Sequence, residues 1–204
     1  MVVLKTSREL AKMREAGRIS ANALKLAGQA VEPGVSTAEI DRVVRKYIEG
    51  QGAKPSFLGY GGFPASACIS VNDEVVHGIP SKKRILKSGD IVSIDVGAFI
   101  DGFHGDNAWT FACGDISAQA QGLLDATKES LFEGIKQAVA GNRIGDIGSA
   151  VQRYVEARSY SVVRDYVGHG VGAKLHEDPS VPNFGTPGRG VLFLKTANRE
   201  NSSS

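Results

Sequence analysis

The 204-residue sequence has only two cysteines, Cys68 and Cys113, and they do not form a Cys-x-x-Cys pair. This excludes a disulfide-stapled fold and a zinc-thiolate site, which both need more cysteines at short spacing. The net charge is only +2, so nothing in the charge favours nucleic acid or an anionic membrane as a partner. No apolar run is long enough for a membrane span or a secretory signal. We therefore expect a cytoplasmic protein.

Nucleotide-binding motifs are also missing. The Gly-rich aromatic segment at residues 57–64 leads into a strand-like run without a Gly-Lys-Ser/Thr tail, which excludes a phosphate-binding loop. The segment GHGVG at residues 168–172 does not match Gly-x-Gly-x-x-Gly, and no acid follows at the distance that a dinucleotide fold requires. Phe57, Tyr60 and Phe63 line either an apolar pocket or the core and a turn, and both interpretations stay open here.

The composition, with 42% apolar and 23% charged residues, is that of an ordinary globular protein, and the length allows one sizeable core or two small ones. Apolar residues recur at helical spacing in four segments, and capping boxes at Thr6 and Ser36 precede the first two. Helices are predicted at residues 6–32, 36–50, 117–140 and 146–158. Strands are predicted at residues 67–71, 91–100, 107–113 and 160–167. The first two helices are expected to cover a sheet.

Two acids interrupt the apolar strands of the hairpin predicted around the turn signal Asp101-Gly102. Folding there brings Asp95 and Asp106 opposite or diagonal to each other on one face. Like charges across a strand pair destabilise it, and burying an unpaired carboxylate is costly, so the pair calls for a cation, most simply a metal ion. The alternative, which stays open at this stage, is a solvated aspartate at a strand end, with Asp101 and Asp106 serving the turn.

Three of the four histidines flank this acidic pair. His77 lies in a loop just after a strand, His169 lies between two glycines, and His176 follows soon after it. Glycines beside His169 allow backbone to approach whatever the imidazole contacts. His104 falls in the predicted hairpin turn, where we expect a structural or a solvent-exposed role. Oxygen and imidazole donors together suit divalent Mn, Co, Fe or Zn.

Two long motifs, GDIVSIDVGAFIDGFHGD and GHGVGAKLHEDP, carry Asp95, Asp106, His169 and His176. With KMREAG near the N-terminus, PGVST at residues 33–37 and CISVN at residues 68–72, they resemble the type I methionine aminopeptidases of the pita-bread family. The resemblance runs through most of the chain. It implies an α+β fold, in which helices cover the outer face of a curved antiparallel sheet with two pseudo-symmetric halves.

The resemblance also implies an active site on the concave face, where two divalent ions activate a water. Asp95 and Asp106 would bridge the ions, and His169 would join Asp106 on one of them. His176 would hold the scissile carbonyl and stabilise charge on it, and His77 would contact substrate near its N-terminal amine. The positions that would line the methionine pocket are Phe57, Tyr60, Phe63, Cys68 and Leu175.

The C-terminal region departs from the family pattern. The likeness continues through TPGRGV at residues 186–191 and then gives way to LFLKTANRENSSS, where the family supplies two further glutamate ligands. Glu200 is the sole acid there and is out of register. We therefore expect one pita-bread domain at residues 1–191, its second half incomplete by truncation or frameshift, and a disordered tail at residues 192–204. Fewer or more weakly bound ions and impaired activity are expected.

The resemblance thus implies a metal-dependent hydrolase that removes the initiator methionine from nascent proteins. Expected partners are peptides with an N-terminal methionine, including ribosome-associated nascent chains. The chain is expected to be a monomer, with exposed strand edges as a possible route to self-association. A non-catalytic pita-bread protein that binds a peptide or a partner is the alternative. A prolidase-like hydrolase is a third interpretation, and Cys68 with the aromatic positions fits it less well.

Overall fold

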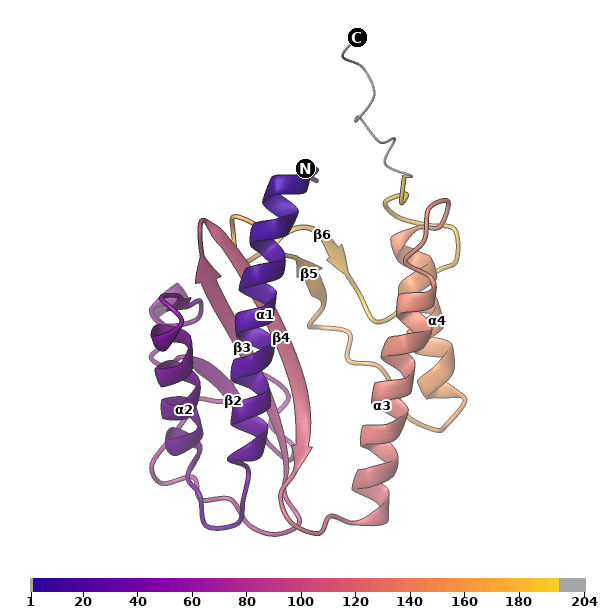
Figure 1. Ribbon diagram of the computed structural model, residues 1–204. Helices are drawn as coiled ribbons and strands as arrows, with labels where there is room; N and C mark the ends of the chain where they lie inside the picture. Colours follow the sequence, from indigo (N-terminus) through magenta and orange to yellow (C-terminus); the bar gives the residue numbers. More distant parts are fainter. Residues whose placement is uncertain (1, 195–204) are drawn as a thin grey trace. The chain divides into compact units, whose positions relative to one another are not determined.

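The computed structural model describes residues 2–194 and combines helices with antiparallel strands (Figure 1). The helices are α1 (Ser7–Gln29), α2 (Thr37–Gly50), α3 (Ala118–Lys136) and α4 (Ile144–Glu156), with a 3-10 turn at Tyr60–Gly62. The strands are β1 (Lys54–Pro55), β2 (Ala67–Val71), β3 (Ile91–Ile100), β4 (Phe103–Ala112), β5 (Gly168–Gly170) and β6 (Glu177–Val181). This arrangement confirms the predicted α+β class.

The described residues form two compact units. The first unit comprises residues 2–121 and 170–178, and the second comprises residues 122–169 and 179–194, so the division falls within α3. None of the described helices has both the length and the apolarity needed to cross a lipid bilayer.

The sheet of the first unit is built around β3, which pairs with β4 on one side and with β2 and the short β1 on the other. Side chains alternate between the two faces of a strand. In β3, Val92, Ile94 and Val96 point to one face and are buried, whereas Ser93 and Asp95 point to the other. The sheet therefore has one apolar face and one face that carries polar groups.

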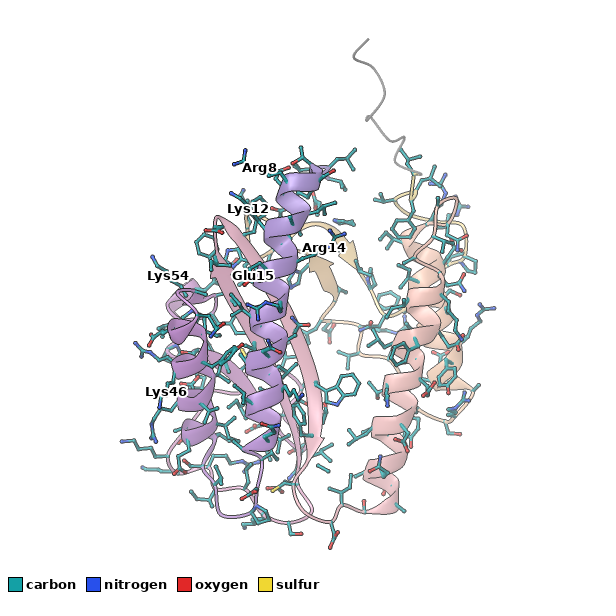
Figure 2. The ribbon with its side chains drawn as sticks, viewed as in Figure 1. Arg8, Lys12, Arg14, Glu15, Lys46 and Lys54 are labelled. Carbon is teal, nitrogen blue, oxygen red and sulfur yellow. The ribbon has the colours of Figure 1, made fainter. Side chains whose placement is uncertain are left out.

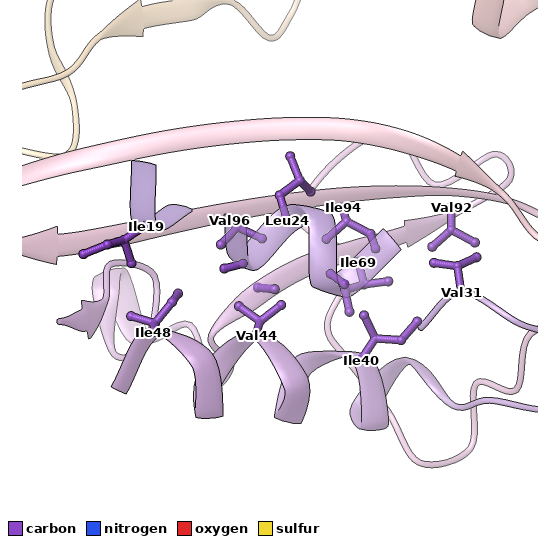
Figure 3. Packing of buried hydrophobic residues seen from close by; sticks show 14 of the residues in the cluster. Ile19, Leu24, Val31, Ile40, Val44, Ile48, Ile69, Val92, Ile94 and Val96 are labelled. Carbon is purple, nitrogen blue, oxygen red and sulfur yellow. The ribbon is translucent and has the colours of Figure 1, made fainter. Parts of the chain in front are cut away.

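Helices α1 and α2 cover the apolar face, as the sequence predicts. Capping boxes begin both helices, at Thr6 with Glu9 and at Ser36 with Glu39. Figure 3 shows how the apolar side chains of these helices meet those of the strands. The buried members of this core include Ile19, Leu24, Ile40, Val44, Ile48, Ile69, Val92, Ile94 and Val96. Burying one such side chain stabilises the fold by about 1.5–3 kcal/mol, so this core holds the sheet to the helices.

The outer faces of the same helices are charged. Figure 2 shows Arg8 on α1 and Lys46 on α2 projecting away from the helices, and both are exposed. Charged residues on the face opposite an apolar stripe are typical of a helix that lies on a sheet. We infer no partner from them.

Helix α1 approaches β4 closely because both elements carry small residues at the crossing. A Cβ atom at Gly105 would lie 2.3 Å from the carbonyl carbon of Ala16 and 2.3 Å from the nitrogen of Gly17. The neighbouring Asn107 donates from its Nδ2 to the Ser20 hydroxyl at 2.6 Å. Because the nearest atoms belong to the backbone of α1, no flexible side chain could move aside, and position 105 requires glycine.

Gly105→Ala is therefore expected to lower the free energy of unfolding by about 1–3 kcal/mol, because α1 must move away from β4. Gly17→Ala is the matched control, since a Cβ atom there meets nothing within 4 Å. The control should raise stability by about 0.5–1 kcal/mol, the gain from replacing glycine within a helix. Urea unfolding of both variants measures the difference, and equal stability of the two would contradict the close crossing.

The second unit contains most of α3, all of α4 and the turn that follows residue 185. Helices α3 and α4 pack closely at Gly134, where a Cβ atom would lie 2.9 Å from Cγ2 of Val151. The turn caps the start of α4, because the carbonyls of Val191 and Arg189 accept from the Ile144 and Gly145 amides at 3.0 and 2.9 Å. The Gly188 amide also donates to Oδ1 of Asp146 at 2.8 Å. The motif TPGRGV therefore serves as a cap for this helix.

Several predicted elements differ from those observed. Residues 160–167 do not form a strand, and most of them are exposed. Their β-forming side chains have no strand beside them among the described residues, and strand preference depends on such neighbours. Helix α3 ends at Lys136, where the Gln137 and Ala138 amides bond to carbonyls three residues back instead of four and so tighten the last turn. Helix α1 ends at Gln29, and Pro33 disfavours helical backbone at the residue before it.

The predicted hairpin is confirmed, but its second strand begins earlier than expected. β4 starts at Phe103, so His104 lies in a strand paired with Phe99 and not in the turn. The turn itself is Asp101-Gly102, and both residues have positive φ. Of the predicted tail, residues 195–204 lie outside the described part of the chain. Phe193 before them donates its amide to the Asn142 carbonyl at 2.8 Å.

Candidate functional site

The two predicted acidic ligands lie on the sheet face that the helices leave uncovered. The register of β3 and β4 pairs Asp95 with Ala108 and Asp106 with Gly97. Residues two apart on a strand share a face, so Asp95 and Asp106 are diagonal neighbours, a separation that side chains can span. Their carboxyl groups hydrogen-bond to each other. The diagonal arrangement is one of the two that the hairpin predicts.

The surroundings of Asp95 favour its protonated form in the metal-free protein. Burial raises the pKa of Asp95 to about 8, and the charge of Asp106 and the hydrogen bond between the two carboxyl groups add to the effect. Two like charges this close cannot both be ionised without a cation. The pair thus has the chemistry of a cation site, because a divalent ion would offset the charges of both carboxylates.

A raised pKa makes the stability of the metal-free protein depend on pH. Asp95 keeps its proton in the folded state, whereas in the unfolded state it loses the proton near its ordinary pKa of 3.8. The folded protein therefore loses stability as pH rises from about 3.8 to about 8, with no further loss above that range. Asp95→Asn removes that loss. The variant is expected to gain stability relative to the wild type between pH 5 and 8, by at most about 1.4 kcal/mol per pH unit. Urea unfolding in EDTA across this range, with Asp101→Asn as control, tests it; parallel wild-type and Asp95→Asn profiles would contradict it.

An apolar cluster lies beside the acid pair. Cys68 is the register partner of Asp95 on β2. Its side chain packs in a buried cluster with Phe57 and Leu175, against which Phe63 also packs. Gly97 makes room for this cluster, since a Cβ atom there would lie 2.8 Å from the Phe57 ring. Four of the five predicted pocket residues are therefore brought together.

Cys68 contributes to this cluster as a neutral thiol. Burial raises its pKa to about 12, and the negative charges of Asp95 and Asp106 add to the effect. A thiolate, the form that binds metal or attacks a substrate, is therefore disfavoured in the metal-free protein. The side chain offers a small, polarizable apolar surface instead.

His176 follows the buried Leu175 and is exposed, so it lies at the edge of the cluster. Its Nδ1 is 2.9 Å from the Tyr60 hydroxyl, and the two rings lie with their centroids 5.3 Å apart. If the phenol donates to Nδ1, the neutral ring carries its hydrogen on Nε2. His176 then presents an N–H donor to a substrate, and Tyr60 is the residue that sets this tautomer.

The remaining two predicted residues, His77 and His169, lie on other segments of the chain. His77 is exposed in the loop after β2 and has a positive φ of 61°. His169 lies in β5 and belongs to the second unit. Among residues 2–194, no three or more His, Cys, Asp or Glu side chains gather closely enough to hold a metal ion. The first unit thus brings together the acid pair, the apolar cluster and the Tyr60–His176 contact.

His104 and its partner Ser56 were not predicted to lie near the acid pair. His104 lies on the same strand face as Asp106, and its Nδ1 is 2.9 Å from the Ser56 hydroxyl. Its ring also contacts Phe99, with centroids 4.6 Å apart, and burial lowers its pKa. The spacing of two residues between His104 and Asp106 was the signal in the sequence, but it is informative only once the strand is known to begin at Phe103.

Comparison with known proteins gives consistent matches along nearly the whole chain. Residues 11–197 match the family described as Metallopeptidase family M24. The methionine aminopeptidase of Clostridium acetobutylicum is 54% identical over 194 residues, which cover 95% of this chain and 78% of that protein. Methionine aminopeptidase 1 of Bacillus subtilis is 52% identical over 190 residues, which cover 93% of this chain and 76% of that protein. The chain thus spans about three quarters of these relatives.

Solved structures agree. The crystal structure of methionine aminopeptidase from Thermotoga maritima has a TM-score of 0.93 and 44% identity, covering 96% of this chain and 78% of that one. The prolidase from Pyrococcus horikoshii has a TM-score of 0.78 but only 22% identity, covering 95% of this chain and 53% of that one, so it is evidence for the fold alone. The pita-bread fold implied by the sequence resemblance is confirmed, and the prolidase-like interpretation has the weaker support.

Proposed function

Since this chain belongs to metallopeptidase family M24, we propose that it is a metal-dependent aminopeptidase that hydrolyses the peptide bond after an N-terminal methionine. The observation that carries the proposal is the diagonal Asp95–Asp106 pair, two neighbouring carboxyl groups whose like charges a divalent cation would offset. Identities of 52–54% to methionine aminopeptidases support the choice of substrate.

Asp95 and Asp106 would hold the metal, and His169 is proposed as an imidazole ligand on the strength of the sequence resemblance. Carboxylate and imidazole donors fit Mn, Co, Fe or Zn. Bound divalent ions would lower the pKa of an attacking water and polarise the scissile carbonyl. We propose that the chain binds fewer ions than its relatives, or binds them more weakly, because no counterpart of the two family glutamates is found in residues 2–194.

The first unit supplies the groups that would bind and orient the peptide. The cluster of Phe57, Cys68 and Leu175 offers an apolar, polarizable surface to the methionine side chain and keeps water from it. The N–H of His176 Nε2, fixed by the Tyr60 hydroxyl, would donate to the carbonyl oxygen as negative charge develops on it. His77 is proposed to contact the substrate near its amine.

Cellular context follows from the same reaction. We propose nascent chains as substrates, including those still on the ribosome, and the cytoplasm as the compartment in which their N-termini become accessible. We propose a monomer, with exposed strand edges as the places where copies could associate.

Release of free methionine from Met-Ala-Ser tests the proposal. The 204-residue chain, supplied with Mn or Co, is expected to release methionine from this peptide but no amino acid from Lys-Ala-Ser, and to lose the activity in EDTA. We expect a slower rate than that of the Bacillus subtilis relative assayed beside it, since misplaced catalytic groups lower rates steeply. No metal-dependent release above a protein-free control would refute catalysis by this chain.

A non-catalytic peptide-binding protein remains the second candidate, and the exposed His176 beside a buried apolar cluster fits it as well. Fluorescence titration with a labelled Met-Ala-Ser peptide separates the two. Saturable binding that depends on an N-terminal methionine, without release of methionine, would favour this candidate.

A further inference from the structure

The N-terminal segment of the first unit contacts the turn that carries His176. Nζ of Lys5 lies 2.6 Å from Oε2 of Glu177, and the two side chains are only 13% and 16% exposed. By contrast, the ion pairs Arg18–Glu15, Arg45–Glu49 and Lys136–Glu133 join neighbours on one helix and are more exposed. A sheltered pair is less screened by solvent than such surface pairs. Lys5 and Glu177 thus connect two segments that are far apart in the sequence.

The Glu177 carboxylate also organises its own turn. Its Oε1 accepts from the Lys174 amide at 3.1 Å. A Cβ atom at Gly172 would lie 2.5 Å from both carboxylate oxygens, so the carboxylate lies directly against this glycine. The Gly172 carbonyl in turn accepts from the His104 amide on β4 at 2.9 Å. The turn is therefore held by the sheet on one side and by Lys5 on the other.

Leu175 and His176 lie between these attachment points. Leu175 is 2% exposed in the cluster with Phe57 and Cys68, and His176 contacts Tyr60. Three consecutive side chains thus have three partners: the apolar cluster, the phenol and the Lys5 ammonium. Without Lys5, the sheltered carboxylate of Glu177 would lack its cation, and turning outward to recover water would move the adjacent His176.

We propose that Lys5 is a positioning residue for His176, which it holds against Tyr60 through its ion pair with Glu177. The proposal deepens the proposed function and rests on it for the catalytic role of His176. It concerns a lysine outside the ligands and the apolar cluster, and it gives the N-terminal segment a part in the site.

Side-chain NMR of histidine nitrogens tests the proposal without requiring activity. The His176 signals, assigned by their loss in His176→Gln, are expected to shift and broaden in Lys5→Ala and in Glu177→Gln, and to remain in place in Lys5→Arg. Lys46→Ala removes an exposed lysine of α2 and is the matched control (Figure 2). Unchanged His176 signals in folded Lys5→Ala would overturn the proposal, even if that variant melts at a lower temperature. Glu177→Gln preserves the side-chain shape and decides the matter if Lys5→Ala does not fold.

Kinetics with Met-Ala-Ser adds a second readout. Misplacing a catalytic group costs rate, so kcat of metal-loaded Lys5→Ala should fall about tenfold, with KM within twofold of the wild type and near-complete rescue in Lys5→Arg. Equal kcat values for Lys5→Ala and the wild type would overturn the proposal. A wild-type chain that releases no methionine would instead refute the proposed function, and the NMR comparison would still decide whether Lys5 positions His176.

Discussion

Asp106→Asn is expected to weaken the binding of Mn or Co to the 204-residue chain by more than about 100-fold, since loss of a residue that merely orients a ligand already costs about 10- to 100-fold. Asparagine keeps the shape of the side chain and removes its negative charge. Asp95 then has no diagonal carboxylate with which to share a cation. Titration calorimetry at pH 7.5 measures the change, and methionine release should fall with it.

Asp101→Asn is the control for this substitution, because it makes the same chemical change in the exposed turn of the same hairpin. Its metal affinity should equal that of the wild type. Asp106→Asn should not destabilise the metal-free protein, because it removes a like charge from beside Asp95. Undiminished metal affinity in a folded Asp106→Asn variant would contradict the assignment of Asp106 as a ligand.

The second large effect is expected at His176. His176→Ala should lower kcat of the metal-loaded chain by about 100- to 1,000-fold, the usual loss when a donor to a developing oxyanion is removed. KM should change little, because the contribution is made in the transition state. Steady-state kinetics with Met-Ala-Ser gives both constants.

Two further variants separate hydrogen-bond donation from packing at His176. His176→Gln retains an N–H donor at similar reach and should restore part of kcat. Tyr60→Phe removes the hydroxyl that lies 2.9 Å from Nδ1 and should lower kcat less than His176→Ala does. Wild-type kcat in His176→Ala would contradict the role of this residue as a donor.

Local signals predicted the first unit well, because each of its elements is specified by residues close in sequence. Capping boxes at Thr6 and Ser36 mark the starts of α1 and α2. The turn Asp101-Gly102 fixes the register of β3 with β4, and that register places Asp95 and Asp106 diagonally. The acid pair could therefore be predicted from the hairpin alone. Residues 160–167 were wrongly predicted as a strand because their apolar pattern depends on partners that the described chain does not supply.

The rest of the site depends on contacts between distant segments, which a single sequence does not reveal. Leu175 joins Phe57 and Cys68 only through tertiary packing, and the family resemblance was the guide to this grouping. The pair of Lys5 and Glu177 joins residues near opposite ends of the described chain, and neither position carries a local motif for it. The roles of His77 and His169 stay predictions.

The central claim is that the Asp95 and Asp106 carboxylates hold a divalent metal ion. Anomalous diffraction from crystals of the 204-residue chain grown with Mn tests it most directly. The account predicts an anomalous peak within metal-ligand distance of both carboxylates, with no such peak in crystals of Asp106→Asn. Peaks elsewhere in the wild-type crystals, with none at the acid pair, would contradict it.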